Sequence, residues 1–288
     1  MRLVALTCAR SEDWILGVSM RVALEWVDAV VLLDHRSEDS TQAIAHDLLS
    51  EHGPDRVRYL RRDDDVWPEM AHRQLMLEVA REMGATHLAL IDADEIVTAN
   101  WLPDLRTAVE RLSPLETLAL WMVPVWGDAR HFRDDDSIWS HAYLTLAVGE
   151  DPGLAWQDRE DGYCHHARAP RGANPATQLG DPTSGGVMHF QFLNRRRLLA
   201  KHVWYRMIEH LRWPGRQTPD QLNAKYDAAL NEAGMRLSEL PSPWLDVYRP
   251  LLDRHLNLDA TPWYEGAISD LLATHGRSYF AGLDLKCF

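Results

Sequence analysis

A short apolar run that ends in three carboxylates constrains the fold of this chain more than any other feature. Residues 88–91 are all apolar, and Asp92, Asp94 and Glu95 follow them almost at once. Such a run is typical of a strand that is covered on both faces. Open α/β sheets bind their ligands at the carboxyl ends of strands of this kind. The sequence therefore predicts an α/β fold with an acidic site at the end of this strand.

Asp92 and Asp94 form an Asp-x-Asp pair, and an extended backbone would point both side chains the same way. Two carboxylates aimed at one point repel each other unless a cation lies between them. Mg²⁺ and Mn²⁺ prefer oxygen ligands and often join one or two carboxylates to substrate phosphates. The pair therefore indicates a site for a metal and a diphosphate. The alternative interpretation is an acidic turn that caps the next helix.

The composition argues against several classes of function. Apolar residues make up 46% and charged residues 25% of the 288 residues, as in an ordinary soluble globular protein. The net charge of −13 argues against general affinity for nucleic acid or anionic membranes. The three cysteines are scattered, which argues against a zinc site and favours a cytoplasmic location. The longest apolar run, residues 118–126, contains Pro124 and is too short to span a bilayer.

The first hundred residues predict four strands that alternate with three helices. The strands are expected at 3–7, 29–33, 57–60 and 87–91, and the helices are expected to end near 27 and to span 41–51 and 68–83. Ser11 is a candidate N-cap for the first helix, and Asp39 with Gln42 resembles a capping box for the second. Right-handed crossovers turn this order into a parallel sheet with helices on both faces.

The remainder of the chain is less regular. Its patterns predict a helix at 104–112, strands at 117–125, 142–148 and 187–192, a basic helix at 195–212, and loops at 127–136 and 151–186. Helices separated by proline turns are expected after that. We therefore expect a first domain over 1–205 and a C-terminal helical appendage over 206–288.

Three motifs taken together resemble one protein family. They are Ala-Arg-Ser-Glu at 9–12, Leu-Asp-His-Arg-Ser-Glu-Asp-Ser-Thr at 33–41 and Ile-Asp-Ala-Asp-Glu at 91–95. In this order and spacing they resemble glycosyltransferase family 2. The resemblance implies the GT-A type of α/β fold, a Rossmann-like and mostly parallel sheet flanked by helices, here with the helical appendage added. It makes 1–205 the catalytic domain that binds the nucleotide sugar.

The resemblance also assigns residues to a nucleotide-sugar site. By matching position, Ala9 and Arg10 would flank the nucleotide, and Asp34 would accept a hydrogen bond from the base or the ribose. His35 stands where the family often has a second acidic residue, so recognition of the base is expected to differ. The Asp-x-Asp pair would hold the metal and the sugar diphosphate, so that Asp92 serves both.

Three further residues are candidates for the same site. Arg73 is expected to approach the nucleotide, and the planar fork of Arg168 would suit a phosphate; plain surface charges are the alternative. Similar enzymes often supply a late histidine, so the resemblance makes His189 a metal ligand together with Asp92 and Asp94. A core histidine is the alternative interpretation.

These residues predict metal-dependent transfer of a sugar from a nucleoside diphosphate sugar, with a UDP-sugar favoured and a hexosyltransferase-type reaction that inverts. Mn²⁺ or Mg²⁺ would neutralise the departing diphosphate.

Inversion needs a general base. Five loop carboxylates are candidates: Asp128, Asp134, Asp135, Asp136 and Asp181. We favour Asp128 as the base, since it follows the strand after the Asp-x-Asp pair. Asp181 is the second candidate for this role. Of the adjacent His165 and His166, at most one would face the site.

The acceptor stays open at this point. A glycan, a lipid-linked sugar, a protein, a small molecule or a modified nucleic-acid base would each fit, and no transmembrane segment is expected. Two other functions fit the same acidic site, namely nucleotidyl transfer and non-catalytic binding of nucleotide sugars. Release of a free nucleoside diphosphate rather than pyrophosphate would exclude the first, and turnover would exclude the second.

Overall fold

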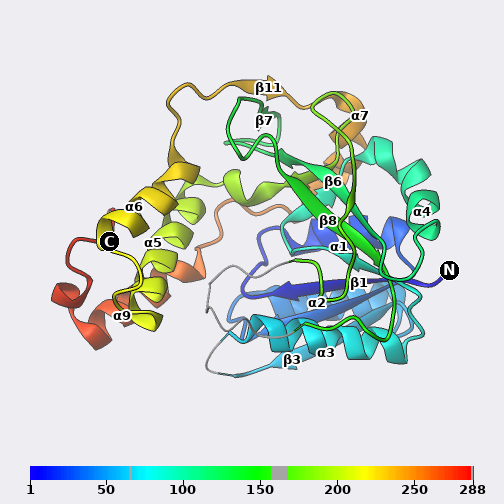
Figure 1. Ribbon diagram of the computed structural model, residues 1–288, viewed down its shortest axis with the longest axis horizontal. Coiled ribbons are helices and arrows are strands. Elements are labelled where there is room, and N and C mark those ends of the chain that lie inside the picture. Colours follow the sequence, from blue (N-terminus) through cyan, green and yellow to red (C-terminus); the bar gives the residue numbers. More distant parts are fainter. Residues whose placement is uncertain (65–66, 157–167, 287) are drawn as a thin grey trace.

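Four parallel strands form the first half of the central sheet (Figure 1). The computed structural model describes residues 1–64, 67–156, 168–286 and 288. The strands β1 (Leu3–Ala9), β2 (Ala29–His35), β3 (Val57–Arg62) and β4 (His87–Leu90) lie in the order β3-β2-β1-β4. The helices α1 (Leu16–Trp26), α2 (Thr41–His52) and α3 (Glu69–Glu82) connect them. The alternating order predicted from the sequence is confirmed.

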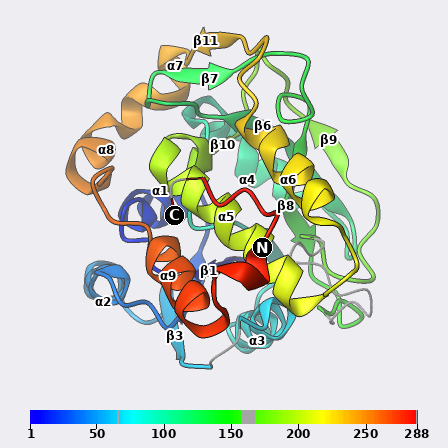
Figure 2. The ribbon, with the colours of Figure 1, turned by 90° about the vertical axis from the view of Figure 1, so that its left-hand side faces the viewer.

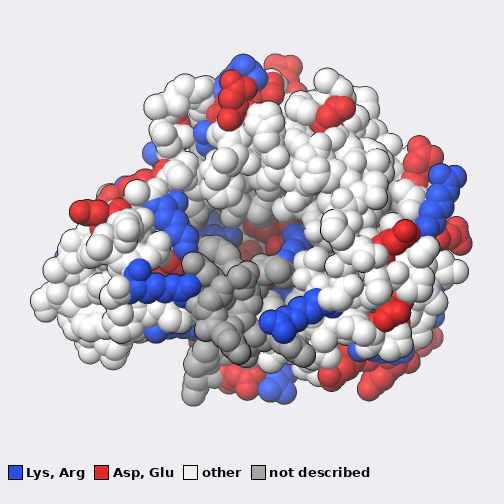
Figure 3. Space-filling model, viewed as in Figure 1, with Lys and Arg blue, Asp and Glu red and all other residues white. Residues whose placement is uncertain are grey.

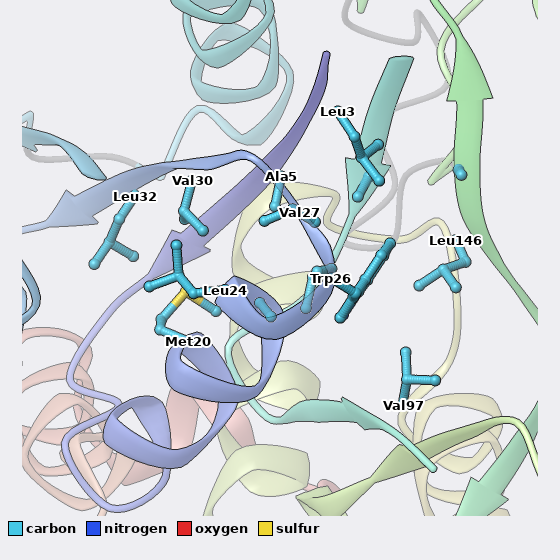
Figure 4. Packing of buried hydrophobic residues seen from close by; sticks show 14 of the residues in the cluster. Leu3, Ala5, Met20, Leu24, Trp26, Val27, Val30, Leu32, Val97 and Leu146 are labelled. Atoms are coloured by element: carbon cyan, nitrogen blue, oxygen red, sulfur yellow. The ribbon is translucent and has the colours of Figure 1, made fainter. Parts of the chain in front are cut away.

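Both faces of this half-sheet are buried. Leu3 and Ala5 of β1 pack on one side with residues of α1 such as Met20, as Figure 4 shows. The intervening Val4 and Leu6 pack on the other side in the same cluster as α3. Successive side chains of a strand point to opposite faces, so a strand covered on both sides must be apolar throughout. This explains the unbroken apolar runs in the sequence.

The second half of the sheet mixes directions. β8 (Tyr143–Gly149) pairs antiparallel with β4, and β6 (Thr117–Pro124) pairs antiparallel with β8. β10 (Val187–His189) runs parallel to β6, and β5 (Glu95–Val97) runs antiparallel to β10. The short β9 (Thr177–Leu179) also pairs with β6, and α4 (Leu102–Glu110) follows β5. The predicted class, α/β with a mostly parallel sheet flanked by helices, is confirmed.

Several local predictions are wrong. The first helix begins at Leu16 rather than after Ser11, because Ser11 adopts a positive φ of 52° and lies in the loop. Asp39 and Gln42 form no capping box: Ser40 is the N-cap of α2, and Asp39 accepts instead from the N–H of Thr41 at 2.9 Å. The strand predicted at 187–192 ends at His189 and gives way to a 3-10 turn. The expected loop 127–136 contains the strand β7 (His131–Arg133).

The C-terminal residues do not form one separate block. The helices α5 (Arg195–Arg212), α6 (Pro219–Asp227) and α9 (Trp263–His275) share a core with each other, and Figure 2 shows α5 and α9 side by side. In contrast, α7 (Ser242–Leu245) and α8 (Arg249–His255) share a core with α1 and β6, and β11 (Leu237–Glu239) pairs with β7. The boundary expected after residue 205 falls inside α5, so we propose that the appendage begins with this helix. No helix among the described residues is long and apolar enough to cross a membrane.

Hydrogen bonds between side chains and backbone join the loops that follow β1 and β2. The N–H groups of Ser11 and Glu12 donate to the hydroxyls of Ser37 and Thr41, at 2.8 and 2.9 Å. Asp34, at the end of β2, is fully buried. Its Oδ1 accepts from the N–H of Ser37, and its Oδ2 accepts from Tyr59 Oη at 2.8 Å and Arg61 Nη1 at 3.0 Å. Asp34 therefore ties the end of β2 both to its own loop and to β3.

We predict that Asp34→Ala lowers the free energy of unfolding by about 2 kcal/mol, because it leaves three donors without their acceptor in a buried place. Asp63→Ala is the matched control, since Asp63 contacts the same Arg61 at 3.1 Å but is exposed, and it should unfold almost as the wild type does. Urea unfolding followed by circular dichroism measures both. Equal unfolding midpoints for Asp34→Ala and the wild type would contradict this role.

Candidate functional site

The acidic residues after β4 lie in a tight turn. β4 ends at Leu90, and the N–H of Glu95 donates to the carbonyl of Asp92 at 3.1 Å, which closes the turn. The expectation that an extended backbone points Asp92 and Asp94 the same way is therefore wrong. Each carboxylate has its own neighbours: Asp92 lies beside two arginines, and Asp94 lies beside His189.

Asp94 and His189 come together because β5 and β10 are paired. His189 is the register partner of Glu95, and the N–H of Phe190 donates to the carbonyl of Asp94 at 2.9 Å. This places His189 Nε2 3.5 Å from Asp94 Oδ1, with both side chains about 15% exposed. Two residues that are far apart in the sequence thus share one small site.

The charges of this pair stabilise each other. Burial alone would lower the pKa of His189, but the adjacent carboxylate of Asp94 outweighs it and raises that pKa. Burial likewise works against the ionised form of Asp94, yet the charge and hydrogen bond of His189 bring the pKa of Asp94 well below its usual range. Asp94 is therefore a carboxylate at neutral pH, which is the form that binds a metal ion.

Asp92 faces the arginines Arg73 and Arg168. Its Oδ1 lies 3.5 Å from Arg73 Nη2, and its Oδ2 lies 3.3 Å from Arg168 Nη1. Desolvation opposes ionisation of Asp92, but these two charges lower its pKa overall. Its side chain is 45% exposed, so it is the acidic group of the turn that solvent reaches most easily. The structure brings both predicted arginines to the Asp-x-Asp turn.

Helix α5 adds two inward-facing cations. The guanidinium of Arg197 donates to Glu12 Oε2 at 2.8 Å, and Lys201 Nζ donates to Gln191 Oε1 at 3.1 Å. Burial opposes the charge of Lys201, but nearby groups, Tyr205 first and Asp94 among them, raise its pKa. The face in Figure 3 is hollowed near its centre, where acidic and basic side chains gather. The basic residues at the start of α5 thus face two ways, because Arg195 and Arg196 are exposed and pair with Glu232 and Glu265 instead.

The residues expected around the nucleotide lie at the ends of β1 and β2. Ala9 is the register partner of Asp34. The guanidinium of Arg10 lies 4.1 Å from the ring centroid of Trp263 in α9, so the C-terminal helices reach this loop. His35 is buried, and its Nε2 donates to the carbonyl of Asp64 at 2.8 Å, since a carbonyl oxygen can only accept. Asp34 itself has protein partners for both oxygens, so contact with a ligand would compete with them.

The two candidate bases lie apart. Asp128 is half-exposed and accepts from the N–H groups of Arg130 and His131 and from His131 Nδ1, and these bonds help to lower its pKa despite partial desolvation. Asp181 caps the turn before β10 by accepting from Thr183 and Ser184, and these hydrogen bonds lower its pKa to about 2. The turn that contains Asp181 precedes the first residue of β10, whereas His189 is the last residue of this strand. His165 and His166 lie outside the described residues.

The sequence indicated Glu95 only as one of the three carboxylates after the strand, with no role of its own, and did not indicate Glu12 as part of the site. Glu95 is 1% exposed and receives two bonds from Arg168, while Glu12 pairs with Arg197. Both glutamates stand within the motifs at 9–12 and 91–95, which was the available signal. Their partners lie more than 70 residues away, so the sequence offered no way to pair them.

The atoms present fit a hard divalent ion. Among the described residues, no group of three or more His, Cys, Asp or Glu side chains is arranged to hold one alone. The 3.5 Å between Asp94 Oδ1 and His189 Nε2 is short enough for one ion to touch both, since such bonds are roughly 2.0–2.2 Å long. Such an ion would need further oxygens from a substrate, and Asp92 lies in the same turn.

Comparison with known proteins agrees with the motifs. Residues 23–149, just under half of the chain, match the family described as Glycosyl transferase family 2. This segment is therefore similar to glycosyltransferase family 2. The α/β architecture of the chain agrees with the fold that the resemblance implies. No curated protein matches the chain.

Three solved structures resemble this chain at low identity. Residues 1–349 of TarS from S. aureus are 11% identical, with 98% of this chain and 83% of that chain covered and a TM-score of 0.45. GalNAc-T7 with UDP, GalNAc and Mn²⁺ is 13% identical, with 96% and 58% covered and a TM-score of 0.40. The mannosyltransferase PcManGT from Pyrobaculum calidifontis, in complex with GDP-Man and Mn²⁺, is 13% identical, with 98% and 85% covered and a TM-score of 0.36.

We predict that His189 of the metal-free protein titrates above the free histidine value of about 6.5, because the charge of Asp94 stabilises the imidazolium. Asp94→Asn should bring the pKa of His189 down, since burial then acts without the opposing charge. NMR of the imidazole ring between pH 5 and 9 measures both. A pKa of His189 that stays the same in Asp94→Asn would contradict the pairing.

Proposed function

We propose that this protein is a metal-dependent glycosyltransferase that moves a sugar from a nucleoside diphosphate sugar, with a UDP-sugar favoured, to an acceptor. The observation that carries the proposal is the Asp94–His189 pair, in which Asp94 follows β4 within the segment that resembles glycosyltransferase family 2 and His189 comes from β10, outside that segment. One oxygen and one nitrogen within 3.5 Å, in a turn with a second carboxylate, are a donor set for Mn²⁺ or Mg²⁺. The reaction is proposed to be of the hexosyltransferase type.

In this proposal Asp92, Asp94 and His189 hold the ion, and the bound ion would neutralise charge on the departing diphosphate. Two cationic side chains of the protein are placed to neutralise charge on the diphosphate as well. Arg73 Nη2 lies 3.5 Å from Asp92 Oδ1, and Lys201, which keeps its charge, donates to Gln191 Oε1 at 3.1 Å. Fixed charges in a partly dry site stabilise developing negative charge more than water does. Arg73 and Lys201 are therefore proposed to orient the diphosphate.

The ends of β1 and β2 are proposed to bind the nucleotide. Ala9 is buried opposite Asp34 at the end of β1, and the guanidinium of Arg10 lies 4.1 Å from the ring centroid of Trp263. Asp34 would contact the ribose or the base by giving up one of its present donors. Tyr59 and Arg61 donate to the same oxygen of Asp34, so the loss of one bond leaves the other in place.

Inversion requires a base, and we propose Asp128 ahead of Asp181. The backbone N–H of Val125 donates to the carbonyl of His189, so the loop that carries Asp128 leaves β6 beside the proposed metal ligand. Asp128 is ionised at neutral pH because its pKa is lowered, and it is half-exposed, so it can accept a proton from an acceptor hydroxyl. Asp181 lies at the opposite end of β10.

We predict that the wild type releases a free nucleoside diphosphate from a UDP- or GDP-sugar only with Mn²⁺ or Mg²⁺ present. Asp94→Ala should abolish this while the circular dichroism spectrum stays native, because the ion loses a charged ligand. His189→Ala should raise the metal concentration needed for half-maximal rate. Pyrophosphate as the product would show nucleotidyl transfer instead, and binding without turnover would show a binding module.

The same assay distinguishes the two candidate bases. Asp128→Asn should lower kcat by about 10²–10⁴, the usual contribution of a general base, with little change in the donor KM. Asp181→Asn keeps an oxygen that can cap the turn, so it should remain within a few-fold of the wild type. The opposite ranking would transfer the role of the base to Asp181.

A further inference from the structure

Every N–H of the Arg168 guanidinium has an acceptor within the protein. Its Nε donates to the carbonyl of Thr145 at 2.7 Å, and its Nη1 donates to Glu95 at 2.6 Å and Asp92 at 3.3 Å. Its Nη2 donates to Glu95 at 2.5 Å and to the carbonyl of Leu90. A guanidinium has five N–H groups, and these are five acceptors. Arg168 therefore has no donor to spare for the phosphate that the sequence analysis assigned to it.

Glu95 depends on this guanidinium. Its side chain is 1% exposed, and each of its oxygens accepts one bond from Arg168. Its Oε2 also accepts from the backbone N–H of Asp92 at 3.0 Å. A carboxylate so deeply buried is costly unless it is paired and hydrogen-bonded. Arg168 provides that pairing, and Glu95 in turn fixes the backbone of the Asp-x-Asp turn.

The acceptors of Arg168 enclose the turn. Leu90 is the last residue of β4, Glu95 is the first of β5, and Thr145 lies on the neighbouring β8. The guanidinium thus joins the strand that enters the turn to the strand that leaves it, and both to β8. Asp92 is the most distant acceptor of Arg168, at 3.3 Å. Arg168 could lose this contact and still hold both oxygens of Glu95.

We propose that Arg168 and Glu95 are positioning residues, a buried ion pair that holds the turn of Asp92 and Asp94 in shape for the metal. Arg168 acts through Glu95 and the backbone rather than by contact with the diphosphate. The metal part of this inference rests on the proposed function. The positioning part concerns the turn itself and can be measured without any substrate.

Arg168→Lys separates positioning from phosphate contact. Lysine keeps the charge and still binds phosphate as a point charge, but it cannot reach both oxygens of Glu95 and two carbonyls at once. Positioning predicts that Arg168→Lys weakens Mn²⁺ binding in the presence of UDP or GDP by about 10-fold or more, as loss of a group that orients metal ligands does. It also predicts faster hydrogen exchange at the backbone N–H of Asp92, because its acceptor loosens.

Arg81→Lys is the matched control. Arg81 also spreads its guanidinium over a carboxylate and two carbonyls, those of Glu150, Asp151 and Leu154, at 2.7–3.1 Å. It lies near the end of α3 and away from the acidic turn. Any loss of stability caused by replacing such a fork should appear in both variants, whereas the loss of Mn²⁺ affinity should appear only in Arg168→Lys. Glu95→Gln, which removes the charge but keeps the shape, should behave like Arg168→Lys.

Titration calorimetry with Mn²⁺ and hydrogen exchange at Asp92, each on the full chain, give the outcomes. Unchanged Mn²⁺ affinity and unchanged exchange in both Arg168→Lys and Glu95→Gln would overturn the proposal. If the wild type binds no Mn²⁺ with UDP or GDP, the proposed function fails, and exchange at Asp92 alone decides. Faster exchange in these variants, but not in Arg81→Lys, then supports the positioning pair, and unchanged exchange overturns it.

Discussion

The antiparallel pairing of β5 with β10 is the contact on which the rest of the site depends. Each strand has only three residues, yet their register places His189 opposite Glu95 and therefore next to Asp94. β10 is held in turn by its parallel pairing with β6. A histidine from late in the chain thus reaches the acidic turn only when the second half of the sheet has formed.

The second constraint is charge. The turn brings three carboxylates together, and in a partly buried place their repulsion would be severe without cations. Among the described residues, Arg73 and Arg168 lie beside Asp92, and the charges of His189, Lys201 and Arg197 act on Asp94. The two sides differ in kind, because arginine keeps its proton whereas histidine can lose it and become a ligand. A metal ion can therefore replace the proton of His189 while the arginines continue to balance Asp92 and Glu95.

The sequence predicted the parallel half of the fold well, because strands such as β1 and β2 are buried on both faces and their unbroken apolar runs mark them. It also placed the acidic turn at the correct strand. It could not predict β5, since three residues carry no periodicity, nor the pairing of Glu95 with Arg168, which depends on tertiary contacts. His189 was named by resemblance, and its position beside Asp94 agrees; its role as a ligand stays a prediction. Asp34 is buried against Tyr59 and Arg61 of β3. Nothing in the sequence near Asp34 indicated these two partners.

Asp94 and His189 are proposed to share a metal ion that also binds a nucleoside diphosphate. A crystal structure of the wild type with Mn²⁺ and UDP tests it most directly. One nitrogen of His189 and one oxygen of Asp94 are expected to lie roughly 2.0–2.3 Å from the same ion, with diphosphate oxygens completing its coordination. An ion bound to the diphosphate with both nitrogens of His189 beyond about 2.5 Å would contradict it.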